Sequence, residues 1–337
     1  MALDYKVLHL TDLTIGYHQG SAIAGPLNLD LYAGQLICVL GPNGCGKSTL
    51  LRTISGLQPA LEGTIEIEGQ SLKSLKPAQI ARLISLVLTD NVRSGNLDVY
   101  SLIALGRYPY SGWLGILSEH DKEVISHAIA VTHTAAFLGR KIDHLSDGEC
   151  QKVMLARAIA QDTPLIILDE PTAHLDLPSR IQLMRLLYQL ARETNKAILI
   201  STHELDLALQ VADQIWLMSS DGHLAAGLPE ELIIDGSFQQ AFDKDGIAFD
   251  ATTGTFHIHT SVNGTISVSG TGPAAYWTKK ALQRIGWQIA VAEQNCSLSL
   301  SVKEEDGGTR WVLHHGNGTA ANYSALSDFL SAILYVQ

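Results

Sequence analysis

The segment Gly41-Pro-Asn-Gly-Cys-Gly-Lys47-Ser48 limits the possible folds of this chain more than any other feature. It fits the pattern G-x-x-x-x-G-K-[ST], and it stands between an apolar run, Leu36 to Leu40, and a helix-forming stretch, TLLRTISGL. Glycines let backbone N–H groups turn inward around phosphates, and the N-terminus of the following helix favours negative charge. A glycine-rich turn with a chance lysine would not come with this strand and this helix. We therefore predict a phosphate-binding loop.

Each side chain of the loop has an expected task. Lys47 supplies a mobile cation, and the Ser48 hydroxyl can contact Mg²⁺. For Cys45, the simplest interpretation is a small residue that fits, and the alternative is a redox-sensing thiol activated by the helix N-terminus. The residues predicted to bind nucleotide here are Gly41, Pro42, Asn43, Gly44, Cys45, Gly46, Lys47, Ser48 and Thr49.

Charge and composition argue against several classes of protein. The 337 residues include 23 basic and 34 acidic side chains, a formal net charge of -11. Sequence-independent nucleic-acid binding depends on clustered Lys and Arg, so we expect no nucleic-acid partner. The four cysteines form no C-x-x-C pair, which signals neither a disulfide framework nor a zinc site. No apolar stretch reaches the roughly 18 residues of a membrane span, so we expect a soluble chain that can still dock on a membrane protein.

Short apolar runs alternate with helical stretches over residues 1–250. Besides Leu36 to Leu40, these runs are Leu165 to Leu168, Ala197 to Ile200 and Gln214 to Leu217. Such continuous hydrophobicity is typical of strands covered on both faces, as in a largely parallel sheet flanked by helices. The predicted fold class is therefore α/β.

Residues 251–337 differ in composition from the rest. They contain five basic and five acidic residues, so the whole net charge belongs to the first 250 positions. They also hold three of the five tryptophans: Trp277, Trp287 and Trp311. We expect a second, small core over 255–337, joined by DATTG at 250–254 as a linker.

The pattern of this tail predicts a compact α+β module. Alternation about Asn263-Gly264 predicts a hairpin from Thr255 to Ser269. The other predicted elements are helices over Pro273 to Ile285 and Asn322 to Leu334 and strands over Trp287 to Ala292, Ser297 to Val302 and Arg310 to His314.

Polar side chains follow two of the apolar runs. Asp169 and Glu170 end one run, where consecutive side chains diverge: Asp169 can reach magnesium through water, and Glu170 can orient a water that attacks the γ-phosphate. His203 ends the run AILIST. The alternatives are surface acids at a strand end and a structural histidine. Two adjacent acids at a buried strand end are costly unless a metal and phosphates use them.

This set of motifs resembles that of the ATP-binding cassette (ABC) ATPases. In their terms, Gly41 to Thr49 is the Walker A motif, Asp169 and Glu170 end the Walker B motif, and His203 is the switch histidine. The segment Leu145-Ser-Asp-Gly-Glu149 is similar to the signature LSGGQ, and Ala173 to Asp176 is similar to the D-loop. The resemblance covers about residues 6 to 235. It implies a P-loop core over 1–250 with a helical subdomain over about 90–160.

The resemblance also implies roles for further residues. Tyr17 would stack on adenine, and Ser146 and Gly148 would touch the γ-phosphate of ATP bound to a second subunit of a homodimer. The implied nucleotide-site residues beyond the Walker A motif are Tyr17, Ser146, Asp147, Gly148, Glu149 and Asp176, with ATP as substrate and Mg²⁺ as cofactor.

Two positions depart from the family pattern. Asp147 replaces the central glycine of the signature, and we expect its carboxylate to face outward. Thr89 and Asp90 stand where the family has the glutamine of its Q-loop. Asp90 is a hypothetical replacement that holds the magnesium or the water, and the alternative is a solvated loop acid.

The segment from Val99 to Tyr110 resembles importer ATPases for iron-siderophore complexes, haem and vitamin B12, where a similar ALGRYPY run faces the permease. Arg107 and Tyr110 fit an interface anchor, whereas Leu102 and Leu105 fit a helical core. The implied protein is a homodimer beneath two transmembrane permease subunits, at the cytoplasmic face of the bacterial inner membrane, acting indirectly with a substrate-binding protein. The alternatives are a different importer, an exporter ATPase and a soluble ABC-type ATPase without a transport role.

The sequence of the tail is consistent with more than one role. His257 and His259 share a strand face, and with His314-His315 they are candidates for a metal or haem sensor. Solvated strand histidines are the simpler interpretation. We favour support of the dimer over sensing as the role of the module.

Overall fold

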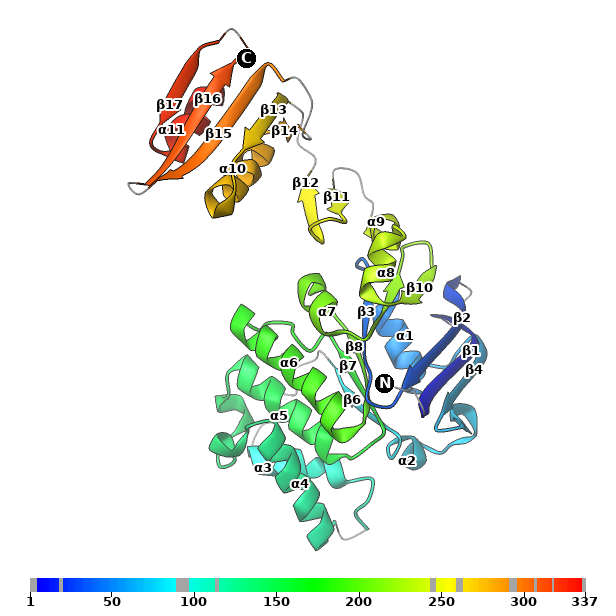
Figure 1. Ribbon diagram of the computed structural model, residues 1–337. Coiled ribbons are helices and arrows are strands. Elements are labelled where there is room, and N and C mark those ends of the chain that lie inside the picture. Colours follow the sequence, from blue (N-terminus) through cyan, green and yellow to red (C-terminus); the bar gives the residue numbers. More distant parts are fainter. Residues whose placement is uncertain are drawn as a thin grey trace. The chain divides into compact units, whose positions relative to one another are not determined.

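The chain forms two compact units (Figure 1). Unit 1 comprises residues 1–243 and 249–256, and unit 2 comprises residues 244–248 and 257–337. The computed structural model describes residues 5–17, 21–88, 97–112, 115–242, 247–258, 263–290, 296–305, 308–316 and 318–334.

A six-stranded sheet, in the order β10-β9-β3-β8-β7-β6, forms the centre of unit 1. Five strands run parallel and β10 pairs antiparallel with β9, which confirms the predicted α/β core. The strands are β3 (Leu36–Leu40), β6 (Ile84–Val87), β7 (Leu165–Asp169), β8 (Ala197–Ser201), β9 (Gln214–Met218) and β10 (Leu224–Gly227).

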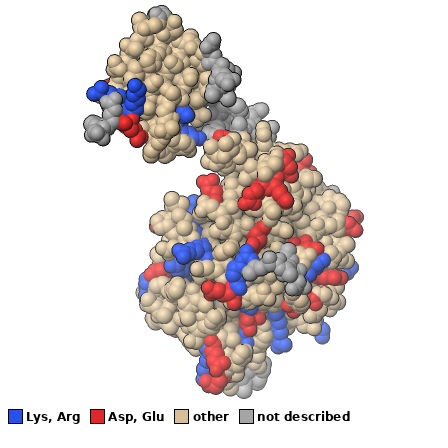
Figure 2. Space-filling model, in the orientation of Figure 1, with Lys and Arg blue, Asp and Glu red and all other residues tan. Residues whose placement is uncertain are grey.

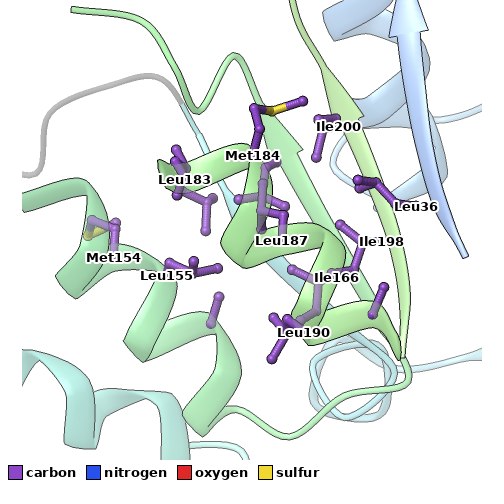
Figure 3. Close-up of a cluster of buried hydrophobic side chains, with 14 of the residues drawn as sticks. Leu36, Met154, Leu155, Ile166, Leu183, Met184, Leu187, Leu190, Ile198 and Ile200 are labelled. Atoms are coloured by element: carbon purple, nitrogen blue, oxygen red, sulfur yellow. The ribbon is translucent and has the colours of Figure 1, made fainter. Parts of the chain in front are cut away.

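The central strands are apolar throughout because both faces of the sheet are covered. Alternate residues point to opposite faces, so Ile166 and Leu168 of β7 join one hydrophobic cluster while Leu165 and Ile167 join the other. Figure 3 shows the first cluster, in which side chains of α6 (Leu177–Thr194) and α5 (Asp147–Ala160) point toward those of β3, β7 and β8. The second cluster lies on the opposite face, where α1 (Lys47–Ile54) packs.

A second, antiparallel sheet adds to the cluster beneath α1. Its order is β2-β1-β4-β5. The strands are β1 (Lys6–Tyr17), β2 (Ser21–Tyr32), β4 (Glu62–Ile67) and β5 (Gln70–Ser71), followed by the short helices η1 (Leu72–Ser74) and α2 (Pro77–Ile80).

Helices occupy the stretch between β6 and β7. They pack on the same cluster as α6, and α5 contacts both α3 and α4. Their bounds are α3 (Val99–Ala104), η2 (Leu105–Arg107), α4 (Glu119–Val131), η3 (Ala135–Phe137) and η4 (Ile142–His144), followed by α5.

The segment DATTG is a hairpin turn and not the expected linker. It joins β11 (Ile247–Asp250) to β12 (Thr255–Ile258), and the Asp250 carboxylate accepts hydrogen bonds from the Thr252 N–H and the Thr253 hydroxyl. The Phe249 ring stacks on Phe238 of α9, and the Phe256 ring meets Phe242 of the same helix edge to face. These contacts hold the turn on unit 1. The helices that precede this hairpin are α7 (Leu205–Val211), α8 (Pro229–Ile234) and α9 (Ser237–Phe242).

Unit 2 is a five-stranded sheet in the order β14-β13-β15-β16-β17, with a hydrophobic core formed with two helices. Trp287 and Trp311 lie in this core, whereas Trp277 is 64% exposed, contrary to the expectation that all three tryptophans mark it. The elements are β13 (Gly264–Ser269), α10 (Gly272–Arg284), β14 (Trp287–Ile289), β15 (Leu298–Glu305), β16 (Gly308–His315), β17 (Ala320–Tyr323) and α11 (Leu326–Leu334).

Two predictions for the tail are wrong. The expected hairpin about Asn263-Gly264 does not form, because β12 pairs with β11 while β13 pairs in parallel with β14 and β15. The Asn263 N–H donates instead to the Gly286 carbonyl, 2.7 Å away. The last helix also begins four residues later than predicted, because Ala320–Tyr323 pairs with β16 as an edge strand.

Within the described ranges, no helix has both the length and the apolar character needed to cross a membrane.

Candidate functional site

The loop that was predicted to bind phosphate lies between β3 and α1, the strand and the helix expected on either side of it. Lys47 is only 6% exposed, and its ammonium donates hydrogen bonds to the carbonyl oxygens of Gly41 (2.8 Å) and Pro42 (3.1 Å). A lysine folded back in this way places a positive charge against the backbone of its own loop. The loop therefore has the charge and the shape to hold an anion.

Two glycines of this loop are required by geometry. Gly41 has φ +149°, and a Cβ there would lie 2.2 Å from the Met218 carbonyl oxygen. Gly46 has φ +109°, and its Cβ would lie 2.5 Å from a methyl group of Ile23. Any larger residue would push the loop away from the neighbouring strands, so these positions accept only glycine.

Cys45 is buried, with 4% of its surface exposed. Burial raises the pKa of its thiol, and this effect outweighs the opposing effect of the nearby Lys47 ammonium. A redox-sensing cysteine needs a lowered pKa and access to solvent. The structure therefore disfavours the redox alternative and leaves Cys45 as a small residue that fits the loop.

Asp169 receives two hydroxyl groups at one carboxylate oxygen. The Ser48 hydroxyl donates to its Oδ1 from 3.1 Å, and the Ser201 hydroxyl donates to the same atom from 2.6 Å. Strand alternation explains the arrangement, because Asp169 and Ser201 are paired across β7 and β8 and point to the α1 face. The site thus joins the end of the central sheet to the start of α1.

Sequence reasoning missed Ser201, which is fully buried. Its hydroxyl accepts a hydrogen bond from the Glu170 N–H at 2.9 Å while donating to Asp169, so it positions both acids. The available signal was its place at the end of an apolar run, directly before Thr202 and His203.

Glu170 and His203 lie in contact, as their sequence positions suggested. His203 Nε2 is 2.6 Å from Glu170 Oε1. Glu170 has φ +50°, an unusual conformation for a glutamate that costs of the order of 1 kcal/mol or more. The bond from its N–H to Ser201 holds this conformation, which aims the carboxylate at His203.

Tyr17 ends β1 close to the start of α1. Its hydroxyl lies 3.4 Å from the Thr49 hydroxyl, and the residue is 60% exposed. An open aromatic ring beside a phosphate-binding loop can stack on a planar base.

The segment Leu145–Glu149 forms the start of α5. Ser146 caps the helix, and Glu149 returns its carboxylate to the Ser146 N–H at 2.8 Å. The hydrogen bond from that N–H is the main cause of a lowered pKa for Glu149. The Arg140 guanidinium, 2.8 Å from the same carboxyl group, lowers this pKa further. Asp147 is exposed in the first turn, as expected.

Gly148 faces the beginning of α6, where a Cβ would lie 3.5 Å from the Ser179 hydroxyl. Asp176 caps α6 by accepting the Ser179 N–H at 3.0 Å. The Arg180 guanidinium donates a hydrogen bond to the Glu204 carboxylate, 2.6 Å away. Glu204 is the residue directly after His203. Packing and hydrogen bonds therefore connect α5, α6 and Glu204.

The interpretation of Arg107 as an exposed interface anchor is wrong. Arg107 is 3% exposed, and its guanidinium donates to Asp121 Oδ1 at 2.8 Å and to the Ala160 carbonyl at 3.0 Å. Hydrogen bonds from Ser118, together with Arg107, lower the pKa of Asp121 to about 2. Tyr110 packs 4.1 Å above the same guanidinium and is half-buried. These residues hold the helices together.

Other residues of this segment reach solvent. Tyr100, Leu105 and Tyr108 are 40%, 46% and 77% exposed. Leu102 is buried as a helical core residue, whereas Leu105 is not, contrary to the sequence-based expectation. The three exposed residues line a hollow of about 350 Å³. We call them the α3–η2 surface.

Several predicted positions lie outside the described residues: Thr89, Asp90, His259 and the side chain of His257. His314 and His315 are consecutive in β16 and so point to opposite faces of the sheet. Among the described residues, no group of three or more His, Cys, Asp or Glu could hold a metal ion. The sensor hypothesis thus has no support from the described part of unit 2.

Comparisons with known proteins cover both units. Residues 24–173 match the family model described as ABC transporter, and residues 263–334 match the one described as iron ABC transporter C-terminal domain. An uncharacterized ABC transporter ATP-binding protein of Methanocaldococcus jannaschii is 35% identical over 252 residues, which are 75% of this chain and 87% of that protein.

Two further relatives are named for what they import. A petrobactin import ATP-binding protein of Bacillus anthracis is 35% identical in sequence. The match includes 74% of this chain and 92% of that protein. A cobalamin import ATP-binding protein of Halobacterium salinarum is 31% identical in sequence, and the match includes 81% of this chain and 70% of that protein. Among solved structures, one described as an inward-facing metal-chelate type ABC transporter is 27% identical, with a TM-score of 0.62 over 70% of this chain and 88% of that chain.

Proposed function

This chain belongs to the family of ABC transporter ATP-binding proteins, and we propose that it is the ATPase subunit of an importer for an iron chelate, haem or cobalamin. The observation that carries the proposal is that the matched family models and the similar proteins point to the same kind of transporter. The relatives named for petrobactin and cobalamin import are similar to 74% and 81% of this chain, and the family model described as iron ABC transporter C-terminal domain matches residues 263–334.

ATP binds in this proposal at the loop between β3 and α1. The backbone amides of Gly41–Thr49 and the Lys47 ammonium hold the phosphates, and Tyr17 stacks on the adenine. Ser48 and Asp169 would hold Mg²⁺, since hydroxyl and carboxylate oxygens are the ligands this ion prefers, and their oxygens lie 3.1 Å apart. When bound, Mg²⁺ supplies positive charge that offsets the charge of the phosphates.

Glu170 is the proposed catalytic carboxylate. It accepts a hydrogen bond from the attacking water, orients that water toward the γ-phosphate and takes its proton as the water oxygen bonds to the γ-phosphorus. The bond from that phosphorus to the β–γ bridging oxygen breaks in the same step, which leaves ADP and inorganic phosphate. His203 contacts Glu170 and is the proposed switch that responds to the γ-phosphate. The 2.6 Å contact between them supports this pairing.

A second copy of the chain completes the site. Ser146 and Gly148 at the N-terminus of α5 contact the ATP held by the other protomer, where the helix dipole favours the γ-phosphate charge. Asp176 lies at that interface. The capping box between Ser146 and Glu149 supports this role because it fixes the first turn of α5.

The ATPase pair acts beneath two permease subunits at the cytoplasmic face of the inner membrane, with a substrate-binding protein on the far side. We assign permease docking to the α3–η2 surface, because exposed aromatic side chains around a hollow are typical anchors at protein interfaces. Closure of the ATPase dimer then moves the permeases, and hydrolysis resets them.

Replacing Ser201 with Ala tests the positioning of the two acids. The loss of hydrogen bonds to Asp169 and to the Glu170 N–H is expected to lower kcat for ATP hydrolysis by about tenfold or more, with a smaller change in KM. Ser85→Ala is the matched control, because Ser85 is an equally buried serine of the same sheet that bonds to Thr163. Equal rates for the two variants would remove Ser201 from the site.

Uptake by living cells tests the importer function. Cells that lack this chain should fail to accumulate one of three radiolabelled compounds: an iron-siderophore complex, haem or cobalamin. Wild-type chain should restore uptake, and Tyr108→Asp should not, although its basal ATPase activity is retained. Tyr188→Asp, a similar change at a partly exposed tyrosine of α6, is the control. Undiminished uptake of all three compounds in cells without the chain would instead favour another importer or a soluble ABC-type ATPase.

A further inference from the structure

Helix α10 of unit 2 carries an aromatic and basic surface. Tyr276 and Trp277 are 49% and 64% exposed, and their ring centroids lie 5.4 Å apart, edge to face. Lys279, Lys280 and Arg284 follow in the same helix, which contains no acidic residue. These three are most of the five basic residues in positions 251–337. We call the five residues the α10 surface.

The core of unit 2 does not need these side chains. The opposite side of α10 provides the buried residues Ala275, Thr278 and Leu282. The Thr278 hydroxyl accepts a hydrogen bond from Trp311 Nε1 at 2.8 Å, which fixes the helix on the sheet. A tryptophan left outside such a well-packed core exposes apolar area to water at a cost in free energy. A partner that covers the ring would remove this cost.

Spacing places the aromatic rings and the cations together. Tyr276, Lys280 and Arg284 are four residues apart and so lie on one face of the helix, and the Lys280 ammonium is 5.8 Å from the centre of the Tyr276 ring. The nearby carboxylate of Glu304 is engaged at the start of the helix, where it accepts the Ala274 N–H. Figure 2 shows few acidic side chains on the visible face of unit 2, whereas unit 1 has many.

The two lysines of this surface favour a lipid partner over a protein partner. Tryptophan and tyrosine are enriched where proteins meet the boundary between membrane and water, and Lys and Arg are attracted to anionic headgroups. Lysine, in contrast, is depleted from protein–protein interfaces. We propose that the α10 surface docks on an anionic phospholipid membrane. This docking goes beyond the proposed transport function, and it would raise the local concentration of the chain beside its permease.

Sedimentation with vesicles tests the proposal on the purified full chain. Wild type should bind vesicles of phosphatidylcholine with one quarter phosphatidylglycerol, bind much less to phosphatidylcholine alone, and lose affinity as salt is raised. Lys280→Glu should lower the partition coefficient by at least about fivefold, because about this factor is expected for the loss of one contact between a cation and a lipid headgroup. Trp277→Ser should also weaken binding but leave its salt dependence unchanged.

A matched control separates local docking from general electrostatics. Lys303→Glu makes the same charge change at an exposed position on β15 of the same unit, and it should leave binding unchanged. The proposal fails if wild type does not bind anionic vesicles at low salt, binds neutral vesicles equally well, or is weakened as much by Lys303→Glu as by Lys280→Glu. If vesicles do not bind but the α10 variants weaken association with solubilised permease, the surface takes a protein. ATP hydrolysis by the same preparations reports on the proposed function independently.

Discussion

Glu170→Gln is expected to lower the rate of ATP hydrolysis by about 10²- to 10⁴-fold while ATP still binds. The glutamine amide keeps the size of the side chain but cannot take a proton from the attacking water. ATP then remains between the two protomers, so the variant should form a dimer in the presence of ATP that wild type forms only briefly. Steady-state ATPase assays and size-exclusion chromatography with ATP measure the two effects.

Glu193→Gln is the control for this substitution, because it removes the same charge from an exposed position near the end of α6. Its rate should equal that of wild type. A Glu170→Gln variant that hydrolyses ATP within about threefold of wild type would show that another group activates the water. The contact between His203 and Glu170 would then have a structural role only.

Arg107→Ala is expected to destabilise unit 1 by about 3–5 kcal/mol. The substitution leaves the carboxylate of Asp121, which is only 6% exposed, without its ionic partner. It also removes the donor to the Ala160 carbonyl at the end of α5. Arg140→Ala removes the more exposed ion pair with Glu149 and should cost less than about 1 kcal/mol, which makes it the matched comparison.

Denaturant unfolding of the full chain measures this difference, with the transition of unit 1 followed separately from that of unit 2. The double variant Arg107→Ala with Asp121→Ala should recover part of the loss, because no buried charge then remains unpaired. If Arg107→Ala proves no more destabilising than Arg140→Ala, the buried pair does not hold the helices together.

The same pair predicts how stability depends on pH. The pKa of Asp121 is about 2 in the folded protein, below its ordinary value of 3.8, so the ionised carboxylate stabilises the fold at any pH above 3.8. This contribution is lost as the pH falls from 3.8 toward 2. Unfolding measured over this range should show wild type losing more stability than Arg107→Ala, because Arg107 provides part of the pKa shift.

Local patterns were sufficient for the centre of unit 1. The strands near 36–40, 165–168, 197–200 and 214–217 could be recognised because each is an apolar run buried on both faces. The phosphate-binding loop could be recognised because its glycines and lysine must stand at fixed spacing. The tail was harder to predict, since Asn263-Gly264 fits a hairpin locally while the pairing of β13 with β14 and β15 is set by distant residues.

The sequence by itself determined the α/β class, the order of the motifs and the identity of the acids, because these depend on residue type and on spacing along the chain. Only the tertiary structure decided which side chains meet. In the folded chain, Ser201 bonds to both Asp169 and Glu170, and Arg107 is buried against Asp121. Trp277 lies outside the core that contains Trp287 and Trp311. The physical reason is that burial and hydrogen bonding depend on elements far apart in the chain, and no local pattern records which of them will pack together.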